Sequence, residues 1–128
     1  MARRGCGTLL KGSGKDQTIW KLEWTYTDGS GAVLLDATQS DEDPTIATPV
    51  AYGGTGITSI RFPKATRVWV QHCSVEAAVA GTSEKSARPG SIVATSGTMN
   101  VVINTPPSTL ADPPSGARGR LVLLLECP

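Results

Sequence analysis

The residue pair with the clearest potential for chemistry is His72-Cys73, because a cysteine beside a histidine can act as a thiol nucleophile with an adjacent base. The pair lies in a stretch, residues 67–75, whose composition favours an extended strand. Neighbouring side chains of a strand point to opposite faces, so the two groups could not meet there. We therefore expect Cys73 to be a structural core residue beside a surface or interface histidine. We assign the chain no catalytic residue and no enzymatic activity.

A second group of chemically capable side chains consists of acids in one predicted loop, Asp36, Asp41, Glu42 and Asp43. Carboxylate oxygens are ligands that calcium prefers, but this group lacks the spaced Asp/Asn-Gly pattern of a dedicated calcium loop. Zinc is favoured even less, because one histidine and three scattered cysteines supply no paired ligand motif. We expect no metal and no cofactor. The acids are interpreted as a solvated face or as a surface on which an arm docks.

Two further patterns have the composition of binding motifs. Gly53-Gly54-Thr55-Gly56 could cradle a phosphate, but no Lys-Ser/Thr follows and no helix is predicted there, so we interpret it as a turn. The stripe Trp20/Trp24/Tyr26 could stack on a carbohydrate or a nucleobase. Because Leu22 continues the same alternation, a core face is the favoured interpretation.

The charges are unevenly distributed although they almost cancel. Twelve basic and eleven acidic side chains give a net charge of +1, which argues against a nucleic acid or an anionic membrane as partner. Residues 1–15 hold four basic side chains and no acid, whereas residues 16–43 hold seven acids and one lysine. This order suggests an N-terminal arm that docks on a partner or a neighbouring subunit, with a solvated tail as the alternative. The partner-binding residues predicted from it are Arg3, Arg4, Lys11, Lys15, Asp41, Glu42 and Asp43.

Cysteine usage and hydropathy bear on where the protein is made. Cys6, Cys73 and Cys127 form an odd set without CxxC spacing, and no N-terminal apolar region suggests secretion. The terminal apolar run is far shorter than the roughly 18 residues that a membrane helix needs. These features predict a soluble protein made in a reducing cytosol.

The elements that position these groups are expected to be short strands. Fourteen glycines and nine prolines among 128 residues divide the chain into short segments, and its length fits one domain. Turn signals recur roughly every 8 to 12 residues through much of the chain, which is the spacing of a sandwich or small barrel. The sequence therefore predicts an all-β fold, an antiparallel β-sandwich or small jelly-roll-like barrel of about seven or eight strands. The domain is expected over residues 16–128, after an extended basic arm, residues 1–15.

The first expected strand, residues 18–26, alternates most clearly, and Asp28-Gly29-Ser30-Gly31 then favours a hairpin with residues 32–35. Residues 67–75 carry apolar side chains on both faces, with Trp69, Cys73 and Val75 on one and Val68 and Val70 on the other. That pattern predicts an interior strand or a subunit contact. Further strands are expected at residues 45–51, 57–62, 91–95, 98–104 and 120–126, with an exposed loop at residues 80–90. The last strand is expected to be buried on both faces.

The second half of the chain resembles a group of small virion proteins of tailed phages. Gly54-Thr55-Gly56-Ile57-Thr58-Ser59-Ile60-Arg61-Phe62-Pro63 leads to a strand, followed by a variable loop and a hairpin. Ala111-Asp112-Pro113-Pro114-Ser115-Gly116 then precedes the terminal strand. This layout is similar to that of phage capsid-decoration and related structural proteins. It covers residues 53–128 and includes neither the first hairpin nor the basic leader.

The resemblance implies a β-sandwich that binds the outer surface of a phage head as a homotrimer and stabilises the shell. Its partner would be the major capsid protein, contacted by the arm, residues 1–15, and by the acidic loop, residues 36–43. The protein would then be located on the capsid surface of the virion after synthesis in the host cytoplasm. A tail-fibre or tail-associated receptor-binding β module is the alternative.

Overall fold

The computed structural model describes residues 17–76, 86–105 and 109–127 of the chain. These ranges contain nine strands and no helix. The strands are β1 (Gln17–Tyr26), β2 (Val33–Leu35), β3 (Val50–Gly54), β4 (Ile57–Arg61), β5 (Arg67–Glu76), β6 (Ser86–Val93), β7 (Thr98–Thr105), β8 (Thr109–Leu110) and β9 (Arg118–Glu126). The expected N-terminal arm, residues 1–15, lies outside the described residues.

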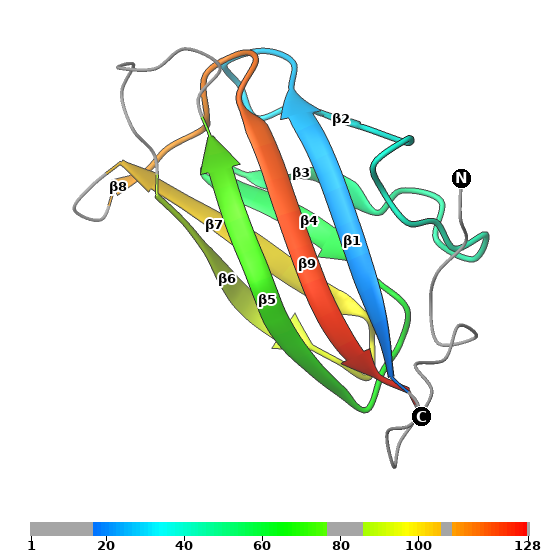
Figure 1. Ribbon diagram of the computed structural model, residues 1–128. Coiled ribbons are helices and arrows are strands. Elements are labelled where there is room, and N and C mark those ends of the chain that lie inside the picture. The colour runs from blue at the N-terminus through cyan, green and yellow to red at the C-terminus, as the bar shows by residue number, and fades with distance from the viewer. Residues whose placement is uncertain (1–16, 77–85, 106–108, 128) are drawn as a thin grey trace.

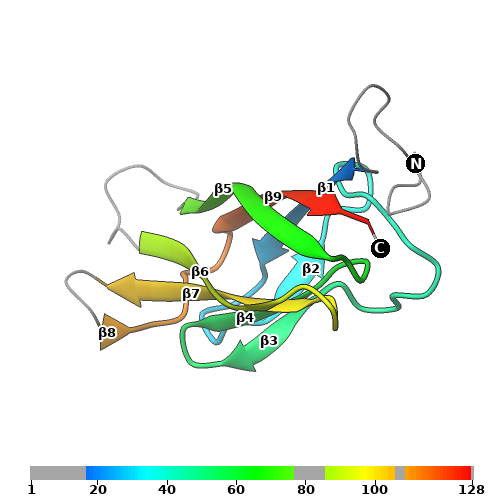
Figure 2. The same cartoon turned by 90° about the horizontal axis from the view of Figure 1, so that it is seen from below.

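The strands form two antiparallel sheets that pack face to face (Figures 1 and 2). One sheet has the order β2-β1-β9-β5, and the other has the order β3-β4-β7-β6 with β8 paired to β7. Buried side chains from both sheets form one hydrophobic cluster between them. The expected all-β sandwich is therefore confirmed.

β1 supplies the largest side chains of this cluster. Trp20, Leu22, Trp24 and Tyr26 all point inward and are at most 1% exposed. The hydroxyl of Tyr26 reaches across the sandwich and is hydrogen-bonded to Thr58 Oγ1 on β4 at 2.7 Å. The aromatic stripe is thus core, as the alternation predicted, and it is not a surface on which a sugar or a base could stack.

β9 lies between β1 and β5 and is a central strand of its sheet (Figure 1). Its inward side chains, Leu121, Leu123 and Leu125, are fully buried. Val122 and Leu124 point to the outer face and are only partly buried. The prediction that this strand is buried on both faces is therefore wrong, because no second layer covers the outer face of this sheet within the described ranges.

β5 differs from its prediction in two respects. It pairs only with β9 among the described strands, so it lies at the edge of its sheet and not in the interior. Its register also shifts between Val70 and His72. A bulge inserts one residue and so reverses which face the later residues occupy. Cys73 packs against the core on the same side as Val68 and Val70, whereas Trp69 points outward.

The second sheet also contains strands that differ from expectation. β3 begins five residues later than expected, and β8 was not expected. β6 begins at Ser86, so the prediction of an exposed loop is wrong for residues 86–90. Pro89 and Gly90 have the composition of a loop, but they lie in this strand. Since β6 lies at the sheet edge, the missing N–H of Pro89 is tolerated there. The segment 53–56 closes the β3–β4 hairpin with Gly56 at a φ of 70°, which confirms the turn.

Candidate functional site

The predicted partner-binding residues fall into two groups. Arg3, Arg4, Lys11 and Lys15 lie outside the described residues. Asp41, Glu42 and Asp43 belong to the segment that connects β2 to β3, which runs along the side of the sandwich next to β1 (Figure 1).

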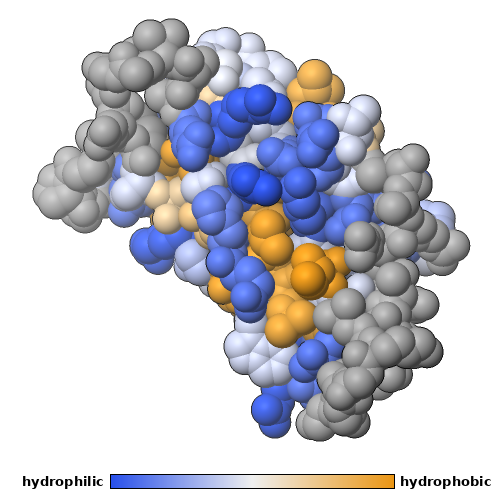
Figure 3. Space-filling view, in the orientation of Figure 1, coloured by the Kyte–Doolittle hydropathy of each residue, from blue (hydrophilic) through white to orange (hydrophobic). Residues whose placement is uncertain are grey.

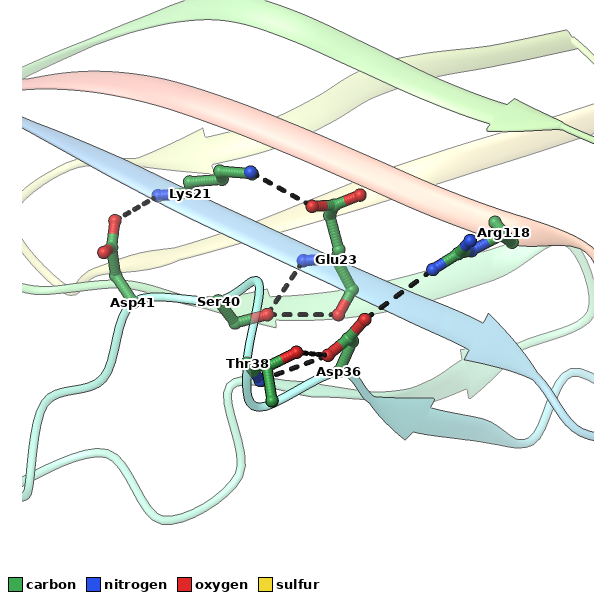
Figure 4. Close-up of polar contacts among 7 residues, drawn as sticks. All are labelled: Lys21, Glu23, Asp36, Thr38, Ser40, Asp41 and Arg118. Atoms are coloured by element: carbon green, nitrogen blue, oxygen red, sulfur yellow. Dashed lines mark hydrogen bonds and ion pairs between the residues drawn. The ribbon is translucent and has the colours of Figure 1, made fainter. Parts of the chain in front are cut away.

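The first half of this segment completes the edge of β1 (Figure 4). β2 pairs only with the last three residues of β1, so none of the described strands pairs with the preceding residues of β1 on that side. Ser40 Oγ accepts a hydrogen bond from Glu23 N at 2.9 Å, and Asp41 Oδ2 accepts one from Lys21 N at 2.8 Å. Asp41 N in turn donates to Lys21 O at 2.8 Å. The segment therefore serves as a substitute for a neighbouring strand.

Asp36 begins the same segment and is stabilised as a carboxylate. Its Oδ1 accepts hydrogen bonds from the hydroxyl of Thr38 at 2.8 Å and from Thr38 N at 3.1 Å. The Thr38 hydroxyl is the main cause of a lowered pKa of Asp36, and Arg118, 3.6 Å away, acts in the same direction. These contacts order the turn that leads into the acidic residues.

Asp41, Glu42 and Asp43 line one pocket of about 400 Å³. Trp20, Leu35 and Ile46 are among its other lining residues, so its wall is mixed apolar and acidic. The structure thus brings the three predicted acids together beside the core. The described residues contain no group of three or more His, Cys, Asp or Glu side chains placed to hold a metal ion.

A second surface feature lies on the outer face of the β2-β1-β9-β5 sheet. Ile19, Leu124 and Trp69 occupy the same row across β1, β9 and β5, because Leu124 pairs with Ile19 on one side and with Trp69 on the other. Val122 lies two residues from Leu124 on the same face. We call these four residues the outer patch: Ile19, Trp69, Val122 and Leu124. Ile19 is 41% exposed and Trp69 is 39% exposed.

The space-filling view shows an apolar area surrounded by hydrophilic atoms on the face that carries β1, β9 and β5 (Figure 3). The next rows on these strands carry charge, with Lys21 beside Val122 and with Glu23 beside Arg120. An apolar centre with a polar rim is the arrangement found in protein-binding surfaces. Neither Ile19 nor the outward residues of β9 were predicted as functional. The only sequence signal for these residues is that apolar side chains occupy outward positions of the strands, where alternation predicts polar ones.

The thiol and the imidazole of the His72-Cys73 pair point to opposite faces of β5, as expected. His72 is exposed, and its Nε2 is hydrogen-bonded to Ser74 Oγ at 2.8 Å. Cys73 packs against the core, and burial raises its pKa to about 11. A thiol so rarely ionised is a weak nucleophile at neutral pH.

The other described cysteine, Cys127, is disulfide-bonded. Disulfides persist in oxidising surroundings. Synthesis in a reducing cytosol, which the cysteine pattern predicted, therefore requires that this bond form afterwards.

The chain matches no family model, no curated protein and no solved structure. Over the ranges that the structure describes, it also has no helix of the length and apolar character that crossing a membrane requires.

Proposed function

We propose that the chain is a non-enzymatic structural protein of a tailed-phage virion, which binds the outer surface of the head as a decoration protein and stabilises the shell. The phage assignment rests on the sequence resemblance over residues 53–128. The part of the proposal that concerns binding rests on the structure of the outer face of the sheet. Its partner would be the major capsid protein, and the homotrimer is the state that the resemblance implies.

The outer patch is the single observation that supports binding to a protein surface most strongly. Apolar side chains form one row across three neighbouring strands, and contiguous exposed apolar area marks interaction sites on protein domains. Tryptophan is enriched among the residues that dominate interface energies, which makes Trp69 the expected anchor. Many equivalent copies on a shell would convert a modest contact of this kind into stable attachment.

A tail-associated receptor-binding module remains the second candidate. The observation that favours it is Trp69 itself, because an exposed indole can stack on the apolar face of a sugar ring. The aromatic residues of β1 no longer support this candidate, since they are buried in the core.

Co-sedimentation with purified heads and purified tails tests the proposal. The protein should pellet with heads assembled from the major capsid protein encoded by the same genome, and it should not pellet with tails. Ile19→Ser and Trp69→Ser should each weaken head binding about tenfold, the effect of losing about 1.4 kcal/mol at an interface anchor.

Ile92→Ser is the matched control, because Ile92 on β6 is 40% exposed, almost the same as Ile19, but belongs to the other sheet. It should bind heads as the unmodified chain does. Equal losses for Ile19→Ser and Ile92→Ser would remove the outer patch from the contact. Binding to tails or to a glycan array, with none to heads, would replace the proposal with the second candidate.

A further inference from the structure

β5 forms an open edge of the β2-β1-β9-β5 sheet (Figure 1). None of the described strands pairs with it on the side away from β9. Its ten residues make it longer than the other edge strands of the two sheets, β2, β3 and β6. β5 contains no proline and no lysine, the residues that commonly protect such edges, whereas β6 contains Pro89. An edge of this length is a template on which another strand can pair.

The direction of the backbone groups on β5 follows from its pairing with β9. Glu126 O accepts a hydrogen bond from Thr66 N at 2.7 Å, so the carbonyl of Glu126 faces β5. Backbone groups of successive strand residues face opposite neighbours, so those of Leu123 face β1. Val70 lies opposite Leu123, and its own N–H and C=O therefore point away from β9, toward the open edge. The same holds beyond the bulge for Cys73, whose partner on β9 also faces β1.

The bulge after Val70 makes the two halves of β5 symmetrical. In an unbroken strand of ten residues, the first and last side chains point to opposite faces. The register shift at the bulge places both end residues, Arg67 and Glu76, on the outer face, and both are exposed. Val68 and Val75 both pack against the core. β5 therefore presents the same order of outward and inward positions from either end.

This symmetry allows β5 to pair with β5 of a second copy. Directly opposite side chains of an antiparallel pair lie on the same face, and a two-fold axis repeats each contact. Pairing centred on the bulge places Arg67 opposite Glu76 of the second copy, at both ends of the strand pair. Neither residue belongs to an ion pair within the described ranges. Val70 then lies opposite Cys73 of the second copy, and the backbone groups of both point toward the shared edge.

We propose that two copies of the chain associate by antiparallel pairing of their β5 strands, which joins their four-stranded sheets into one sheet. The opposite charges at the two ends of β5 set the register of the pair. Because the inward faces of both copies lie on the same side, both outer patches lie on one face of the joined sheet. This inference does not depend on the phage assignment, and its dimer differs from the homotrimer that the resemblance implies.

Sedimentation equilibrium of the full chain measures the association. The mass should approach twice 13.3 kDa as the concentration rises. Arg67→Glu and Glu76→Arg each replace two attractions by two repulsions, so each should raise the dimer dissociation constant at least about tenfold. The double variant exchanges the charges and should return to within about threefold of the unmodified chain. Arg61→Glu, a charge reversal at an exposed site on β4, is the matched control and should have no effect.

Amide hydrogen exchange of the unmodified chain identifies the edge itself. The amides of Val70 and Cys73 should exchange at least about fivefold more slowly in the dimer and lose this protection on dilution. The amide of Trp69 faces β9 and should be equally protected at every concentration.

Three results would overturn the proposal. The first is a chain that stays monomeric up to about 1 mM or that forms a trimer. The second is a double variant that associates no better than Arg67→Glu or Glu76→Arg alone. The third is exchange at Val70 that does not depend on concentration.

Discussion

Gly119 on β9 offers the sharpest test of how the Trp24 side chain packs in the core. It pairs with Trp24 on β1 and with Val75 on β5, and it is buried. A Cβ added there would overlap Cε2, Nε1 and Cζ2 of the Trp24 indole. The absence of a side chain at residue 119 therefore provides the space that the indole ring occupies.

The expected cost of Gly119→Ala follows from two opposing effects. Trp24 is 1% exposed and belongs to the core cluster, and overpacking a core typically costs about 1–3 kcal/mol. The lower entropy of the unfolded chain offsets about 0.4–1 kcal/mol of this. We expect a net loss of about 1–1.5 kcal/mol in the free energy of unfolding. For a chain of this length, that corresponds to a fall in Tm of roughly 4–7 °C.

Two other glycines separate the steric effect from the backbone effect. Gly29 has nothing within 4 Å of its added Cβ and has no positive φ, so Gly29→Ala should be neutral or slightly stabilising. Gly54 also has open space but a φ of 129°, so Gly54→Ala should lose about 1–3 kcal/mol by backbone strain alone. Urea unfolding followed by circular dichroism gives the three free energies on one scale.

The steric explanation can fail in two clear ways. If the Gly119→Ala variant has the same urea midpoint as the Gly29→Ala variant, the Trp24 indole does not pack closely on β9 at residue 119. The penalty should also shrink in a Trp24→Phe background, because the smaller ring leaves room for the methyl group. If the free-energy losses of Gly119→Ala and Trp24→Phe simply add in the double variant, contact with the Trp24 ring is not the cause of the Gly119→Ala loss.

Two further predictions concern buried side chains. Tyr26→Phe should destabilise the protein by about 1–3 kcal/mol, because Thr58 Oγ1 loses its partner in the core, whereas Thr58→Val combined with Tyr26→Phe should recover part of that loss in the same unfolding assay. Burial raises the pKa of Cys73 from 9.0 to about 11. At pH 8 the folded protein should therefore present roughly a hundredth of the thiolate of the unfolded chain, and mass-mapped alkylation at Cys73 should be slower by about that factor. The raised pKa also means that its contribution to stability is complete below about pH 9 and declines as the pH rises through about 11. Alkylation of Cys73 at equal rates in the folded and unfolded protein would contradict its burial.

β1 shows which parts of the fold can be read from local sequence. Its inward residues recur every second position, and this period alone identifies the buried face of an extended segment. The first hairpin was predictable for the same reason, because the turn residues between β1 and β2 lie next to both strands. Neither inference requires knowledge of a distant segment.

β5 and β6 show where local reading failed. The bulge after Val70 arises from pairing with β9, some fifty residues later, and it reverses the faces of all residues beyond it. Without the bulge, strict alternation along residues 67–75 predicts Trp69 and Cys73 on the same face of the strand. In β6, Pro89 and Gly90 have the composition of a loop, but their position at the edge of a sheet makes them compatible with a strand.

The candidate sites follow the same division. The sequence by itself determined the fold class, the aromatic core face of β1 and the clustering of acids at residues 41–43, because each depends on residues close together in the chain. Only the tertiary structure decided that these acids share a pocket with Trp20 and that Ile19, Leu124 and Trp69 form one row. Such surfaces combine segments that pairing between strands brings together, and pairing register is a property of the whole sheet.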